Sequence, residues 1–196
     1  MALIGVGPIV DRIKLILETY LNTEVDRIDT AEDALAPSGV TEADFTTPTV
    51  ADDDIQRFSD DRRAEPNARL VIVPQASSDP QAFRHLGAGT GNPIVDRTHD
   101  LQILVKCASR GKPTGEAESW GETGAWRRAS RISTAVDVVI SRYPRMDVPG
   151  ASPAVAALQG ATMLSESIDR LSDEDVEDTT VVGFAVNVTV RLRRTR

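Results

Sequence analysis

The sequence predicts an α+β protein: a two-layer sandwich in which two amphipathic helices pack on a mainly antiparallel sheet of about four strands. Two observations lead to this prediction. Apolar residues recur at helical spacing over residues 8–21 and 126–143, and strand patterns occur over 69–73, 99–107 and 163–193. A sheet with one apolar face needs cover, and two amphipathic helices supply it. A length of 196 residues fits a single domain, residues 1–196, with a long acidic arm.

The two helices are predicted from apolar stripes bounded by prolines. In the first, the stripe consists of Ile9, Ile13, Ile16, Leu17 and Tyr20. Pro8 suits the first turn, where its missing N–H is not needed. The second helix carries a similar stripe between Ile132 and Tyr143, and Pro144 is expected to end it.

The first pair of strands is predicted to form an antiparallel hairpin. Residues 69–73 are an apolar run ended by Pro74, which is typical of a buried strand. Residues 99–107 alternate apolar and polar side chains, as in a half-buried strand. The turn-rich stretch 74–93 joins the two.

Residues 163–193 are predicted to form a second hairpin. The residues from 182 to 192 alternate between large apolar and small or polar side chains, which is the period of a strand. Residues 163–171 are ambiguous between strand and helix. The segment 173–178 holds five carboxylates in six residues, so we expect it to be the turn and to project into solvent or into a cavity.

The acidic arm is predicted over residues 22–68. Between residues 24 and 65 there are thirteen acidic side chains and four basic ones. The arm is either a flexible loop or a segment that orders against a neighbouring subunit. Because residues 49–58 allow a short helical turn, Ile55 and Phe58 are candidate contacts at a subunit interface.

Charge and composition narrow the class of protein. The net charge is −8, and an acidic protein is repelled by nucleic acid. The end of the chain differs, because its last six residues carry four arginines. This end is either a solvated terminus or a contact with an acidic neighbouring subunit, for which Arg191, Arg193 and Arg194 are the candidate residues.

Targeting signals are not evident in the sequence. The N-terminus lacks the basic start and long apolar stretch of a signal peptide, and no apolar run approaches the ~20 residues that span a bilayer. With Cys107 as the single cysteine, no disulfide can form within the chain. We expect a protein of a reducing cytosol, or one assembled there into a particle, and no membrane partner.

Candidates for catalysis or metal binding are few. His99 and Cys107 are eight residues apart, which is about 26 Å along a straight strand, so one ion cannot bind both. We expect His99 to be a polar residue at a strand edge and Cys107 a small core thiol. The stretch from Gly87 to Gly91 is not followed directly by a helix, as a phosphate loop would be, and suits a hairpin tip. We predict no catalytic residue, cofactor or metal, and no enzyme activity.

Five segments, taken in order, resemble a known family. These segments are Pro8–Leu21, Leu70–Val73, Asp100–Lys106, Ile132–Tyr143 and Val181–Arg193. Their order of helix, long-tipped hairpin, helix and closing strand ending in arginines resembles the tail terminator proteins of long-tailed bacteriophages. The resemblance implies a virion structural protein of the viral tail or neck, assembled in the host cytoplasm.

The family also implies partners. Its members form a hexameric ring that caps the tail tube protein and meets the head connector or stopper protein, with DNA passing through the lumen without specific binding. On that basis a lumen-facing acidic turn is expected, made of Asp173, Glu174, Asp175, Glu177 and Asp178. One alternative is another neck protein, such as a head-completion, stopper or tail-completion protein. A different class is an enzyme or a regulatory binding protein with an unfamiliar site.

Overall fold

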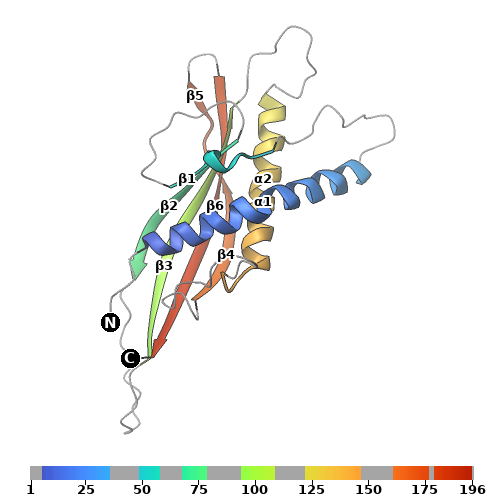
Figure 1. Cartoon of the computed structure of the whole chain (residues 1–196). Coiled ribbons are helices and arrows are strands. Elements are labelled where there is room, and N and C mark those ends of the chain that lie inside the picture. The colour runs from blue at the N-terminus through green and yellow to red at the C-terminus, as the bar shows by residue number, and fades with distance from the viewer. Residues whose placement is uncertain are drawn as a thin grey trace.

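The computed structural model describes residues 6–35, 49–57, 68–78, 94–108, 122–146, 161–176 and 179–195. Its elements in chain order are the helix α1 (Gly7–Leu35), the 3-10 turn η2 (Asp52–Asp54), the strands β1 (Ile55–Arg57), β2 (Ala68–Ser78) and β3 (Ile94–Ala108), the helix α2 (Glu122–Arg142), and the strands β4 (Ala161–Arg170), β5 (Glu174–Val176) and β6 (Thr179–Thr195). The fold is α+β, with two helices and a mixed sheet, and Figure 1 shows the long strands β2, β3 and β6 side by side.

The sheet has the strand order β1-β2-β3-β6-β4, and β5 pairs with the start of β6. β1 runs parallel to β2, and every other pairing is antiparallel. β5 lies on the same side of β6 as β4, because Val181 of β6 pairs with Ala108 of β3 on one side and with Glu174 of β5 on the other. The predicted count of about four strands is therefore too low. β1 and β5 have three residues each, too few to show a period in the sequence.

Both predicted hairpins are confirmed as antiparallel pairs, β2 with β3 and β4 with β6. The ambiguous stretch 163–171 is a strand for most of its length. The prediction that Pro74 ends the first strand is wrong, because β2 continues to Ser78. A register shift between Pro74 and Ala76 accommodates the proline, which has no N–H to donate to the ladder.

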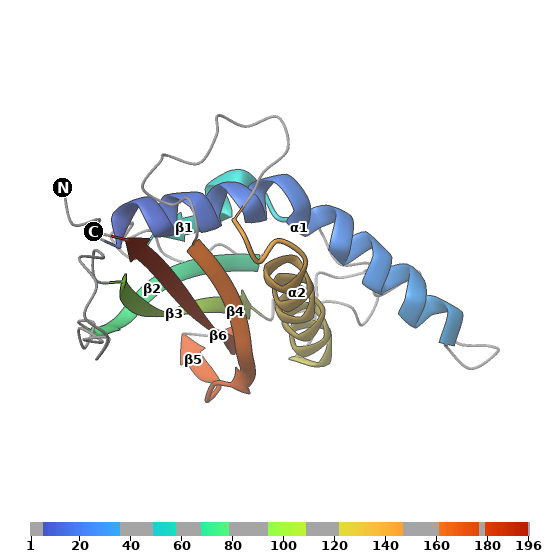
Figure 2. The ribbon, with the colours of Figure 1, turned by 90° about the horizontal axis from the view of Figure 1, so that it is seen from below.

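The core lies between one face of the sheet and the two helices, which cover the same face (Figure 2). Four residues of the predicted stripe of α1, Ile9, Ile13, Ile16 and Leu17, are each 0% exposed, and so is the flanking Leu21. The fifth, Tyr20, is only partly buried. Ile132 and Val139 of α2 belong to the same buried core as alternate residues of the central strands, such as Ile103 and Val186. Each such side chain contributes about 1.5–3 kcal/mol by leaving water. Tyr20 and Tyr143 stack between the helices, with ring centroids 4.0 Å apart.

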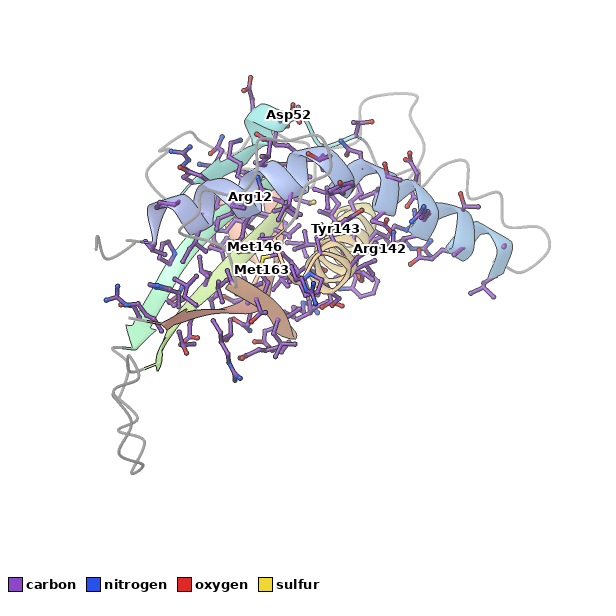
Figure 3. All side chains as sticks on the ribbon, turned by 60° about the horizontal axis from the view of Figure 1, so that its bottom comes forward. Arg12, Asp52, Arg142, Tyr143, Met146 and Met163 are labelled. Atoms are coloured by element: carbon purple, nitrogen blue, oxygen red, sulfur yellow. The ribbon has the colours of Figure 1, made fainter. Side chains whose placement is uncertain are left out.

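The turn after α2 is tied to both α1 and the sheet. Arg12 Nε donates to the carbonyl oxygen of Met146 at 2.7 Å, and the N–H of Met163 donates to the carbonyl oxygen of Pro144 at 2.6 Å (Figure 3). Met146 has a φ of 57°, in the left-handed region, and its side chain is 0% exposed. Pro144 does end the helix, as the sequence predicts, and burial of Met146 then fixes the way the chain leaves α2.

The helix α1 is longer than the sequence predicts. It continues to Leu35, so residues 22–35 are not part of an irregular arm. Arg131 of α2, whose side chain is 2% exposed, pairs with Asp29 at 3.1 Å and with Glu32 at 2.5 Å. The acidic side chains that suggest a solvated arm are thus bound by a buried arginine about a hundred positions away, which no local pattern reveals.

The second described part of the arm, residues 49–57, also packs on its own chain. Lys14 Nζ donates to the carbonyl oxygens of Asp52 and Ile55, and Arg57 pairs with Asp11 at 2.8 Å. The short helical turn predicted over 49–58 is the 3-10 turn η2, and β1 follows it. Within the described residues, the acidic stretch is therefore an element of the fold. Residues 36–48 and 58–67 lie outside them.

A candidate assembly surface

The face of the sheet opposite the helices is covered by no helix of the described residues (Figure 2). Strand registers place alternate side chains of four strands on it. They include Val71 and Gln75 of β2, Asp100, Gln102, Leu104 and Lys106 of β3, Ala185, Asn187, Thr189 and Arg191 of β6, and Leu164, Ser167 and Asp169 of β4. We call it the helix-free face.

A row of amide side chains crosses the helix-free face from β2 to β4. Gln75 Nε2 donates to Gln102 Oε1 at 2.8 Å, and Gln102 Nε2 donates to Asn187 Oδ1 at 2.9 Å. Asn187 Nδ2 then donates to Ser167 Oγ at 2.9 Å and to Asp169 Oδ2 at 2.6 Å. Cross-strand bonds of this kind fix the strand register and so make this face a defined surface.

Leu164 is the large apolar side chain that stands out on this face, with an exposed fraction of 56%. It lies on β4, the last strand on its side of the sheet. A second exposed side chain of the same strand, Ile168, is 38% exposed. The outer edge of β4 is partly engaged, because Met163 already donates to Pro144. The remainder of β4 and its exposed leucine are one part of the sheet that is open to a partner.

The predicted acidic turn is partly strand. Residues Glu174–Val176 pair with Thr179–Val181, which shortens the connection to Glu177 and Asp178, and these two lie outside the described residues. Asp173 pairs with Arg170 at 2.9 Å, and Glu174 pairs with Lys106 at 3.0 Å.

Both Asp173 and Glu174 are exposed. Their carboxylates are partly neutralised by the chain itself and do not stand alone in solvent. Asp175 belongs to β5, and its side chain is not described.

The predicted basic end extends the last strand. Arg191 is exposed on the helix-free face, in register with Thr98 and Thr162. Arg193 and Arg194 belong to β6 through backbone pairing with β3, and their side chains are not described. With 17 residues at about 3.3 Å each, β6 spans about 55 Å. The acidic segment and the arginines therefore lie at opposite ends of one strand (Figure 1).

Ile55 is not an interface residue of the kind predicted. Its side chain is 2% exposed, because β1 pairs with β2 and places Ile55 beside Leu70 in the chain's own core. Phe58, the second residue proposed with it, lies outside the described residues.

The histidine and cysteine predictions have different outcomes. Cys107 is a core thiol, as predicted, and burial raises its pKa to about 12. The prediction for His99 is wrong: it lies in the middle of the strand order, faces the helix side and is 2% exposed. Among the described residues there is no group of three or more His, Cys, Asp or Glu side chains that could hold a metal ion. His85 lies outside them.

The amide row could not be predicted from the sequence, because its members come from four separate strands. In the described residues neither helix is long and apolar enough to cross a membrane. Together, fold and surface define an α+β protein with one helix-free sheet face and unlike charges at the two ends of its longest strand. Neither a family model nor a curated protein matches the chain.

Proposed function

We propose that this chain is a structural subunit of a virus particle, one that forms a ring resembling the tail terminator of a long-tailed bacteriophage. The ring would cap the tail tube and meet the head connector, with DNA passing through its lumen. The observation that supports this most is the separation of charge along β6, with the acidic segment at one end and the arginines at the other.

The two sheet edges favour contacts between unlike surfaces. One edge is the three-residue β1, and the other is the ten-residue β4. Contacts between unlike surfaces are heterologous, and they generate a ring when the rotation closes. Exposed strands are also commonly protected by a neighbouring chain.

The charged ends of β6 and the two edges of the sheet offer contacts in different directions. Strand ends lie along the strand axis, whereas the edges lie to its sides. Neighbours in a ring would meet through the edges, so the acidic and basic ends would be left for partners above and below the ring. This fits a subunit placed between two different components, a tube and a connector.

The exposed leucine on β4 gives a direct test of ring formation. In Leu164→Lys, an apolar contact is replaced by a charge, and we expect a smaller assembly by light scattering coupled to size exclusion. The matched control is Leu35→Lys at the end of α1, where the leucine is 83% exposed and far from the sheet. Equal assembly sizes for wild type and both variants would count against the β4 contact.

The gene neighbourhood offers an independent test. A major tail protein encoded next to this chain would support the tail terminator over the other neck proteins. Genes for an unrelated metabolic pathway on both sides would contradict the proposal.

A further inference from the structure

A cavity of about 260 Å³ lies where the distal half of β2 meets the first half of β3, close to the start of α1. Val6 and Pro74 contribute apolar surface to it. Ser77, Arg97 and His99 contribute polar groups. The register shift after Pro74 displaces the end of β2 at this place, and such bulges often open space beside functional groups.

The three polar residues lie on one face of the sheet. Ser77 is the cross-strand partner of His99, and Arg97 is two residues from His99 on β3. Because side chains alternate along a strand, all three point to the side that carries the helices. A hydroxyl, a guanidinium and an imidazole are thereby brought to one hollow.

His99 is the feature that requires an explanation. Its side chain is 2% exposed, and neither Nδ1 nor Nε2 has a hydrogen-bond partner among the residues that the structure describes. Buried polar groups in proteins nearly always have one. Thr189, which is 5% exposed, follows that rule, because its hydroxyl donates to the carboxylate of Glu166 at 2.6 Å and also lies 3.1 Å from that of Asp100. A neutral imidazole has one hydrogen-bond donor and one acceptor. His99 lines the cavity, and both of these groups are without a partner among the described residues.

The charge and size of the cavity limit the ligand. Arg97 places a positive charge in the hollow, which disfavours a metal cation and favours an anion. Burial, and then Arg97, lowers the pKa of His99, with Asp100 acting in the opposite direction. The volume lies below the roughly 300–1,000 Å³ of typical cofactor and ligand pockets. A short carboxylic acid or a single acidic side chain therefore fits, and a nucleotide does not.

We propose that this cavity is a carboxylate-binding site. Arg97 balances the charge of the carboxylate, His99 and Ser77 donate hydrogen bonds to its oxygens, and the aliphatic part rests against Val6 and Pro74. The ligand is either a free short-chain acid or an Asp or Glu side chain of a second copy of this chain. This inference is independent of the ring proposal, since a monomer has the same cavity.

The test is a titration followed by NMR on the full chain labelled at histidine. The chain has two histidines, so the spectrum of His85→Gln assigns the His99 signal. Propionate and N-acetylglutamate amide represent the free acid and the side chain, and propionamide is the uncharged control. We expect a saturable shift of the His99 signal with at least one acid and none with the amide.

Variants make the test specific. Arg97→Gln should bind the preferred acid about tenfold more weakly, the ratio expected for loss of one charge-assisted hydrogen bond. Arg145→Gln, an exposed residue in the turn after α2, should bind as wild type does. Circular dichroism confirms that each variant is folded.

Tighter binding of N-acetylglutamate amide would indicate a protein side chain as the natural ligand, and tighter binding of propionate a free acid. No saturable shift with either acid would overturn the proposal. Equal binding by wild type and Arg97→Gln would overturn it as well.

Discussion

Asn22 of α1 and Val50 are joined by two hydrogen bonds through a single side chain. Asn22 Nδ2 donates to the carbonyl oxygen of Val50, and the N–H of Val50 donates to Asn22 Oδ1, both at 2.9 Å. The amide thus satisfies both backbone groups of a residue whose side chain is 2% exposed. It holds the segment that leads into β1 against the helix.

Removal of this contact should destabilise the fold. In Asn22→Ala two hydrogen bonds are lost, each worth about 0.5–1.5 kcal/mol, so we expect the free energy of unfolding to fall by about 1–3 kcal/mol. Urea denaturation measures the change, and the amide of Val50 should exchange faster with deuterium. The matched control is Thr23→Ala, an exposed neighbour on α1 whose effect should stay within about 0.5 kcal/mol. An Asn22 variant no less stable than the control would contradict the assignment.

The buried arginine of α2 should support the distal half of α1. In Arg131→Ala, Asp29 loses a partner in a site where it is largely buried, so we expect a loss of about 3 kcal/mol. Amides of residues 29–35 should exchange faster, because that part of the helix loses its attachment to α2. Arg145→Ala, on an exposed turn residue, is the control. Unchanged exchange over 29–35 would show that the arginine does not hold the helix.

Cys107 should react with thiol reagents only when the chain unfolds. It is 0% exposed, and burial raises the pKa of its thiol from 9.0 to about 12. The unfolded state therefore loses the thiol proton at a lower pH than the folded state does. Stability from this group is complete below pH 9 and declines as the pH rises from there toward 12.

Labelling with a chromogenic disulfide at pH 8 measures the reactivity of this thiol. Its rate should rise with urea in step with unfolding, while a cysteine introduced by Thr134→Cys at an exposed helix position should react at once. Rapid labelling of Cys107 in native buffer would contradict the buried position.

Charge reversal at the basic end should weaken assembly in a position-dependent way. Arg191→Glu changes the net charge as much as Arg145→Glu does, but only Arg191 lies at the arginine-rich end of β6. We expect Arg191→Glu, and more strongly Arg193→Glu with Arg194→Glu, to reduce binding to an acidic partner. Pull-down of the adjoining particle component at two salt concentrations measures this. Equal losses for Arg191→Glu and Arg145→Glu would indicate a general effect of charge.

The sequence predicts well those elements whose signal is local and regular. α2 and the apolar stripe of α1 are such elements, and so are β3 and β6, because many residues in succession repeat one period. The three-residue strands give too short a signal. The distal half of α1 gives the wrong signal, because its acidic residues resemble a solvated loop until Arg131 is seen to bind them.

The features of the candidate assembly surface and of the cavity also differ in whether the sequence predicts them. The positions of the acidic segment and of the arginines along the last strand follow from the sequence alone, because both are continuous. The burial of Ile55 depends on its parallel pairing with Leu70. The cavity at His99 depends on the shifted register of β2, which places Ser77 opposite it. Neither of these two strand pairings can be predicted from the local amino-acid composition.

The mass of the assembled species tests the central proposal most directly. Native mass spectrometry of the full chain, over a hundredfold range of concentration and at low and high salt, measures the number of subunits. The ring proposal predicts one closed oligomer that gains population with concentration and loses it in Leu164→Lys but not in Leu35→Lys. A monomer under every condition, for wild type and variants alike, would contradict it.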